Sequence, residues 1–174
     1  MTNTLNLEKT TVVVTGAAGF IASALITKIL ENTVTTQIIG IDSLDPYYSI
    51  KIKKQRLRQL SKNHRFRFRR LSFASAQMKK LLDAIDGPIV FIHAAAKVGL
   101  RAGESNPQSY LQTNVLAVET LLSYLQTNRS IKHGIFFSSS SVYGDSLNLP
   151  FNEASALDVL AARSLYGVSK VSLE

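Results

Sequence analysis

The sequence predicts an α/β protein built on a doubly wound parallel sheet, and two observations lead to this prediction. Five short segments rich in β-branched and aromatic residues alternate with helical patterns along the 174 residues. Two of these segments are continuous apolar runs, which are typical of parallel strands covered by helices on both faces. The length fits a single domain, residues 1–174, with a hydrophobic core of its own.

The first half of the chain supplies three strands and two helices. Thr11–Thr15 is a continuous β-branched run that predicts the first strand, and residues 20–30 carry apolar side chains at helical spacing. Gln37–Ile41 predicts the second strand. Residues 47–61 predict a helix with apolar residues on one side and cations on the other. In residues 65–70 phenylalanines alternate with arginines, as in a half-buried strand at or near a sheet edge.

The second half continues the alternation. Residues 76–85 predict a short helix that a Gly-Pro pair ends, and Ile89–His93 predicts an apolar fourth strand. Residues 107–128 predict one long helix with a wide apolar face. Residues 133–138 predict the fifth strand. A last helix is expected to begin near Ser164 and to run to the end of the sequence without a C-cap.

Composition narrows the class of protein. Hydrophobic residues make up 45% of the chain and charged residues 18%, as in a globular domain. Cysteine is absent, so a disulfide framework and a thiolate metal site are excluded, and no metal site is predicted. The N-terminus has no signal-peptide pattern, and no apolar run approaches the roughly 18–20 residues that span a bilayer. We therefore expect a cytoplasmic protein without a membrane segment.

The net charge of +8 comes from one segment. Residues 51–80 hold 12 of the 20 lysines and arginines and no acidic residue. Such a stretch could bind polyanions through phosphate contacts. The alternative is a solvated helix face followed by an edge strand protected by charge. We favour this alternative because no nucleic-acid module accompanies the stretch, and no nucleic-acid partner is expected.

A glycine-rich turn joins the first predicted strand to the first helix. Gly16 permits the tight turn, Gly19 lets the backbone approach a pyrophosphate, and the helix N-terminus adds free N–H groups. Asp42, at the end of the second strand, would accept hydrogen bonds from the ribose hydroxyls and repel a 2′-phosphate. Ser43 stands where an arginine would favour NADP. These features predict a Rossmann-like NAD site; the alternative is a purely structural turn.

A tyrosine and a lysine lie four residues apart in the last predicted helix. Tyr166 and Lys170 therefore share one helix face. A free phenol titrates near pH 10, so a neighbouring ammonium is needed to make the phenolate accessible near neutrality. Serines 138–141, just past the fifth strand, offer a hydroxyl that can share the substrate oxygen with the phenol. The set predicts proton abstraction coupled to a nicotinamide cofactor.

Together these motifs resemble the extended short-chain dehydrogenase/reductases. The resemblance rests on TGAAGFIA, Asp42, HAAAKVG, FFSSSSVYG and YGVSK, and it covers nearly the whole sequence. More narrowly, IDSLDPYYSIKIKKQRL and GLRAGESNP resemble the UDP-glucuronate 4-epimerase branch. Members of the family continue for further strands and a substrate domain, so the resemblance implies that these C-terminal parts are missing here.

The resemblance also implies roles for individual residues. The catalytic residues it implies are Ser139, Tyr166 and Lys170. The cofactor-binding residues it implies are Gly16, Ala18, Gly19, Phe20, Ile21, Asp42, Ser72, Ala94, Ala95, Ala96, Lys97, Asn114, Ser138, Tyr166 and Lys170. The substrate-binding residues it implies are Arg101, Ser139 and Ser140. As alternatives, Arg101 is a surface charge and Asn114 a partner within the helix, while His93 is expected to be a hydrogen-bonded strand-end residue. Ser72 stands near the position where the family usually has an aspartate beside the adenine, so the resemblance implies that this hydrogen bond is weaker or is made by Ser72.

The activity that the resemblance implies is NAD-dependent 4-epimerisation of a nucleotide sugar such as UDP-glucuronate, in a homodimer. A dehydratase, decarboxylase or reductase of the same family is the first alternative. A non-catalytic NAD-binding module is the second, because the substrate domain is missing from these 174 residues. For the same reason we expect the isolated chain to be inactive.

Overall fold

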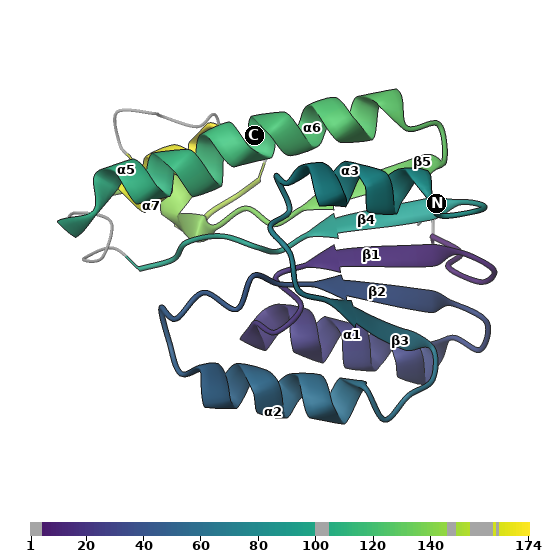
Figure 1. Cartoon of the computed structure of the whole chain (residues 1–174). Helices are drawn as coiled ribbons and strands as arrows, with labels where there is room; N and C mark the ends of the chain where they lie inside the picture. Colours follow the sequence, from purple (N-terminus) through teal and green to yellow (C-terminus); the bar gives the residue numbers. More distant parts are fainter. Residues whose placement is uncertain (1–4, 100–104, 146–148, 154–161, 163) are drawn as a thin grey trace. The chain divides into compact units, whose positions relative to one another are not determined.

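The computed structural model describes residues 5–99, 105–145, 149–153, 162 and 164–174. Its sheet has the strand order β3-β2-β1-β4-β5 (Figure 1). The strands are β1 (Thr11–Thr15), β2 (Gln37–Ile41), β3 (Phe66–Arg69), β4 (Ile89–His93) and β5 (Ile131–Phe136). The pairs β1–β2, β1–β4 and β2–β3 are parallel, so the predicted Rossmann-like sheet is confirmed.

The chain divides into two compact units. The sheet unit comprises residues 1–95 and 123–135, and the helix unit comprises residues 96–122 and 136–174. In the sheet unit, α1 (Phe20–Asn32) and α2 (Ile50–Leu60) lie on one face of the sheet (Figure 1). Helix α3 (Ala76–Asp83) lies on the other face.

The core of the sheet unit lies along its central strands. Val12, Val13 and Val14 of β1 are completely buried, and Ile89 and Phe91 of β4 are buried to the same degree. Strand β1 lies between β2 and β4 and is covered by helices on both faces, which is why its sequence is apolar without alternation. This packing fixes the turn that follows β1 at the carboxyl edge of the sheet.

Two elements of the sheet unit begin at other residues than predicted. Helix α2 begins at Ile50 rather than at residue 47, because the Tyr47 N–H donates to Asp45 Oδ1 (2.9 Å) in a preceding turn. Strand β5 begins at Ile131, two residues before the predicted 133–138. The reason lies in its neighbour: the Ile89 N–H at the start of β4 donates to the Ser130 carbonyl (2.8 Å), and the ladder starts there.

The charged segment 51–80 is only partly solvated. As expected, β3 is an edge strand in which Phe66 is buried and Arg67 is exposed. Lys53 and Arg65, however, are buried, with exposed fractions of 6% and 8%. Arg65 donates to the carbonyls of Leu30 and Thr36 and thereby holds the end of α1. The expectation of a solvated helix face is therefore wrong for Lys53, and the expectation of charges that protect an edge strand is wrong for Arg65.

The predicted long helix 107–128 is interrupted. It consists of α5 (Pro107–Leu111), a π-helical turn (Gln112–Leu116) and α6 (Ala117–Thr127). Asn106 caps its start, since its side chain accepts the Ser109 N–H. A π turn accommodates one residue more than an α-helical turn and is frequent at functional sites.

The helix unit ends in two short helical elements. A 3-10 turn (Ser140–Tyr143) follows β5, and α7 (Leu165–Val171) contains the tyrosine–lysine pair. Ser164 caps α7 by accepting the Gly167 N–H (3.0 Å). Helix α7 does not run to the end of the sequence as predicted: it ends at Val171, where the Ser172 N–H closes the last turn. None of the helices that the structure describes combines the length and apolar character needed to cross a bilayer.

Candidate functional site

The turn after β1 requires a glycine for two reasons. Gly16 has a φ of +71°, in the left-handed region that is unfavourable for residues with a Cβ. A Cβ at Gly16 would also lie 2.9 Å from the backbone N and Cα of Ala95. The chain after β4, including Ala94 and Ala95, therefore passes directly beside the turn. Only methyl side chains border the turn there, as a bound dinucleotide would require.

The N-terminus of α1 is suited to an anion. Gly19 is the N-cap, so no side chain caps the helix, and the first turn contains no acidic residue. Phe20 and Ile21 are 74% and 62% exposed. The positive end of the helix dipole is therefore not neutralised by its own side chains. This end of α1 and the Gly16 turn together fit the pyrophosphate of a dinucleotide.

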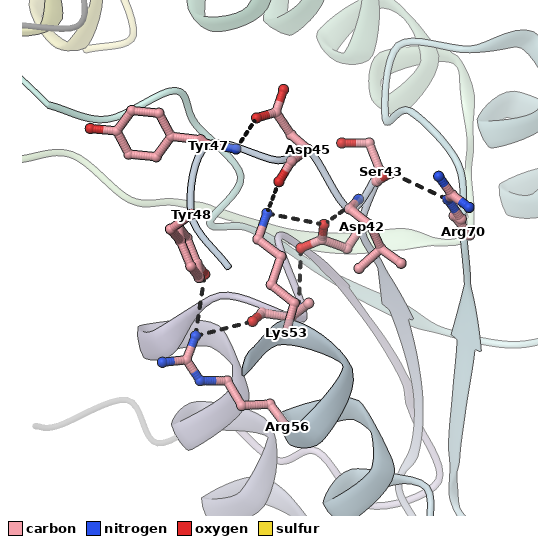
Figure 2. Close-up of polar contacts among 10 residues, drawn as sticks. Asp42, Ser43, Asp45, Tyr47, Tyr48, Lys53, Arg56 and Arg70 are labelled. Carbon is pink, nitrogen blue, oxygen red and sulfur yellow. Dashed lines mark hydrogen bonds and ion pairs between the residues drawn. The ribbon is translucent and has the colours of Figure 1, made fainter. Parts of the chain in front are cut away.

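Asp42 is tied to this turn. It is 8% exposed, and its Oδ2 accepts the Ala18 N–H at 3.1 Å while its Oδ1 accepts the Leu44 N–H at 2.7 Å (Figure 2). Each carboxylate oxygen therefore keeps acceptor capacity beyond these bonds. The carboxylate lies at the end of β2, as the sequence predicted, and its position fits the acceptor of ribose hydroxyls.

Cations from α2 reach the same place, and sequence reasoning missed them. Lys53 Nζ donates to the Asp45 carbonyl (2.8 Å) and lies 3.9 Å from Asp42 Oδ1 (Figure 2). Arg56 donates to the Ala18 carbonyl (3.3 Å) and to the Tyr48 hydroxyl (3.2 Å). The signal was the basic helix itself, in which Lys53 and Arg56 stand three residues apart on one face.

Ser72 and His93 also lie in the sheet unit. Ser72 is exposed after β3, and it accepts hydrogen bonds from Ala74 N–H and Ser75 Oγ within its own turn. His93 is 1% exposed, and its Nδ1 lies 2.8 Å from Thr15 Oγ1. As expected, it is a hydrogen-bonded strand-end residue. Among the described residues no cluster of histidine and acidic side chains could hold a metal ion.

In the helix unit, Asn114 connects two segments. Its Oδ1 accepts the Lys97 N–H (2.8 Å), and its Nδ2 donates to the Lys97 carbonyl (2.9 Å) and to Ser169 Oγ (3.2 Å). Asn114 lies in the π turn and is 6% exposed. It thus fixes the segment containing Ala96 and Lys97 against α7. Lys97 Nζ in turn donates to Ser109 Oγ of α5.

The tyrosine–lysine pair lies on α7. Lys170 is 5% exposed, donates to the Phe137 carbonyl at 2.6 Å, and has its Nζ 6.0 Å from the centroid of the Tyr166 ring. Burial lowers the pKa of Lys170 below its usual 10.5. The ammonium is therefore held in one direction beside the phenol ring.

The serines lie next to this helix. Ser139 caps the 3-10 turn, since its Oγ accepts the Ser141 N–H (3.2 Å). Ser140 is exposed, and Ser138 Oγ donates to Glu174 Oε1. A Cβ at Gly167 would lie 2.9 Å from the Ser141 carbonyl oxygen, so this glycine lets α7 pack directly against the turn. Sequence reasoning missed this role of Gly167, because no local pattern indicates it. Arg101, the predicted substrate-side arginine, lies outside the described residues.

Comparison with known proteins agrees with this geometry. Residues 12–174 match the family model described as the NAD dependent epimerase/dehydratase family. The chain belongs to this family. The resemblance predicted from the motifs is therefore confirmed, and the cofactor of this epimerase/dehydratase chain is NAD.

Several relatives of this epimerase/dehydratase chain have known names. It is 31% identical to Protein CapI of Staphylococcus aureus, over 94% of this chain and 47% of the relative. It is 30% identical to a probable UDP-glucuronate 4-epimerase of Rhizobium meliloti, over 92% of this chain and 46% of the relative. The chain spans about half the length of the curated relatives that it matches.

A solved structure is similar over the same portion. This is the UDP-glucuronic acid 4-epimerase from Bacillus cereus in complex with UDP-glucuronic acid and NAD. The TM-score is 0.82 at 32% identity, covering 93% of this chain and 49% of that protein. The epimerase/dehydratase chain therefore shares the fold of the part of that enzyme which it covers.

Proposed function

We propose that this chain is the nucleotide-binding and catalytic part of an NAD-dependent 4-epimerase acting on a UDP-glucuronate-like sugar. The observation that carries the proposal is the arrangement on α7, where the buried Lys170 ammonium lies beside the Tyr166 ring. The similarity to proteins named as UDP-glucuronate 4-epimerases supports the substrate class. Residues 1–174 are proposed to form one dinucleotide-binding domain of that enzyme.

Tyr166 is the proposed base. Its phenolic oxygen accepts the proton of the sugar 4-hydroxyl, and the positive charge of Lys170, with Nζ 6.0 Å from the ring centroid, faces the site of that transfer. The hydrogen bond from Lys170 to the Phe137 carbonyl keeps that charge in place while the proton moves. Ser139 donates a hydrogen bond to the same sugar oxygen that Tyr166 contacts. This hydrogen bond keeps the oxygen in one position while the sugar turns over.

The cofactor fits the sheet unit. Gly16 and Gly19 flank a turn whose two alanine side chains, Ala17 and Ala18, are buried, so its backbone is open to the pyrophosphate, and Asp42 accepts the ribose hydroxyls. When bound, NAD supplies a hydride acceptor that is regenerated at the end of each turnover, which is why tight binding suits an epimerase. In the helix unit Asn114 holds Lys97 and α7 together and thereby positions Tyr166.

The test joins residues 1–174 to the C-terminal half of the Bacillus cereus enzyme, because the chain covers 49% of that protein. We expect the joined protein to convert UDP-glucuronate into its 4-epimer without net NADH formation. Tyr166→Phe should abolish turnover and change the NAD dissociation constant by less than about twofold, since the phenol acts on the proton rather than on the cofactor. Turnover in Tyr166→Phe would remove this residue from the role of base.

Other products would identify the alternatives. Loss of carbon dioxide or water from the sugar would indicate a decarboxylase or a dehydratase, and net consumption of NADH would indicate a reductase. NAD binding without any reaction in the joined protein would favour a non-catalytic module. The 174-residue chain by itself should show no turnover, because misplacement of the substrate alone is costly.

A further inference from the structure

The carboxylate at the end of β2 does not stand alone. The Asp42 side chain accepts two backbone N–H groups, and the ammonium of Lys53 lies 3.9 Å from its Oδ1 (Figure 2). Lys53 is 6% exposed, so its charge is poorly screened by solvent. A lone aspartate would exclude a 2′-phosphate by repulsion, but this aspartate is accompanied by a cation. Asp42 therefore discriminates against a phosphate less strongly than its position alone implies.

A second cation, Arg70, lies near Asp42 on the side away from Lys53 (Figure 2). Arg70 directly follows β3, and its Nε donates to the Ser43 carbonyl at 3.4 Å (Figure 2). Strands β2 and β3 are parallel with Ile41 opposite Arg69, so the residues that follow them meet at one edge of the sheet. Ser43 follows Asp42 at the position where an arginine would favour NADP. Arg70 bonds to the Ser43 carbonyl and so brings a guanidinium to this position from the neighbouring strand end.

The accessibility and chemistry of Arg70 suit a phosphate. Arg70 and Ser43 are both exposed. Among the described residues the hydrogen bond to Ser43 uses only Nε of Arg70, which leaves the N–H groups of both terminal nitrogens for a ligand. A guanidinium presents these donors in a planar fork that matches phosphate oxygens.

We propose that Arg70 binds the 2′-phosphate of NADP, so that this chain accepts NADP in addition to NAD. The inference rests on the proposed dinucleotide site at Gly16 and Asp42 and adds a phosphate subsite to it. Lys53 offsets the charge of Asp42, and Arg70 supplies the direct ligand. Arg56 belongs to a different part of the site, because its guanidinium is bonded to the Ala18 carbonyl on the glycine turn.

The experiment measures dissociation constants for NAD and NADP by calorimetry at moderate salt. The test variant is Arg70→Ser, and the matched control is Arg67→Ser, which removes the same charge from an exposed position of β3, the strand that Arg70 directly follows. The wild-type chain should bind NADP within about tenfold of NAD. Arg70→Ser should weaken NADP by about tenfold or more, as expected for one charge-assisted contact, and NAD by less than about twofold. Arg67→Ser should change neither by more than about twofold.

Each other outcome has a distinct meaning. If NAD binds but NADP does not, or if the two serine variants weaken NADP equally, Arg70 is no phosphate ligand and the proposed function is untouched. A parallel loss of NAD affinity in Arg70→Ser would equally overturn the inference. If neither nucleotide binds, the proposed function fails together with the inference. Should Arg70→Ser fold poorly by circular dichroism, Arg70→Lys replaces it: it keeps the charge, loses the fork, and should weaken NADP about threefold to tenfold.

Discussion

The substitution Gly16→Ala isolates what the glycine turn contributes to stability. It forces an alanine to adopt a φ of +71° and brings its Cβ to 2.9 Å from backbone atoms of Ala95. Gly87→Ala is a matched control, because Gly87 has a φ of +84° and nothing within 4 Å of its added Cβ. The control therefore carries the backbone cost alone, and the comparison separates that cost from the steric clash.

The two costs have different sizes. A left-handed backbone conformation costs an alanine about 1–2 kcal/mol, of which the lower chain entropy of the unfolded alanine variant returns about 0.4–1 kcal/mol. Gly87→Ala should accordingly lower the free energy of unfolding by about 0–1.6 kcal/mol. Overpacking against backbone that cannot move away adds about 1–3 kcal/mol. Gly16→Ala should therefore lower the free energy of unfolding by about 1–5 kcal/mol in total, of which about 1–3 kcal/mol is absent in Gly87→Ala.

Urea unfolding followed by far-ultraviolet circular dichroism measures both variants, since the chain has no tryptophan to report by fluorescence. The same samples are titrated with NAD, which should bind Gly87→Ala normally and Gly16→Ala at least about tenfold more weakly, because the turn must shift. Equal destabilisation of the two variants would show that Ala95 does not constrain the turn, and the account of the pyrophosphate site would lose its basis.

Three further predictions concern other parts of the chain. Asp42→Asn should weaken NAD and bring the dissociation constants of NAD and NADP closer together in calorimetry; an unchanged ratio would contradict its role. Burial lowers the pKa of Lys170 in the folded chain below its usual 10.5. At a pH between the folded-state and unfolded-state pKa values, the unfolded chain therefore binds more protons than the folded chain. The wild type should therefore gain stability relative to Lys170→Met as the pH rises through that window. Urea unfolding near pH 7 and about pH 10 measures this gain, and an equal difference in unfolding free energy at the two pH values would contradict it. Leu111, Leu116 and Leu122 are 43%, 55% and 37% exposed in the helix unit, so we expect self-association at micromolar concentration. Light scattering that gave 19.1 kDa at every dilution would refute it.

The local features of the nucleotide site could be predicted from the sequence. Gly16 and Gly19 are required by the backbone of one turn, and Asp42 stands at the end of a strand whose apolar pattern is unambiguous. Such features depend on residues close together in the chain, so their pattern is visible without the fold. The tyrosine–lysine spacing on α7 is visible for the same reason.

Contacts that only the folded chain brings together could not be predicted. Lys53 occupies a polar position of an amphipathic helix, yet its aliphatic stem is buried and its ammonium meets a carbonyl and a carboxylate from the preceding loop. Arg70 meets Ser43 only because β2 and β3 are neighbours in the sheet. Gly167 resembles any helical glycine until the turn at Ser141 packs against it. The periodicity of a sequence says which face is polar, but not what stands opposite that face.

The π turn at Gln112–Leu116 has a consequence for aligning this chain with others. Relative to an unbroken α-helix it amounts to a single inserted residue, and one residue corresponds to a rotation of about 100°. A homologous helix without the turn would therefore need a one-residue gap at this point. An ungapped alignment that matches α5 would pair Leu122 of α6 with a residue on a different face. Insertion or deletion of one residue between Asn114 and Leu122 would rotate Leu122 by about 100° about the helix axis relative to Asn114.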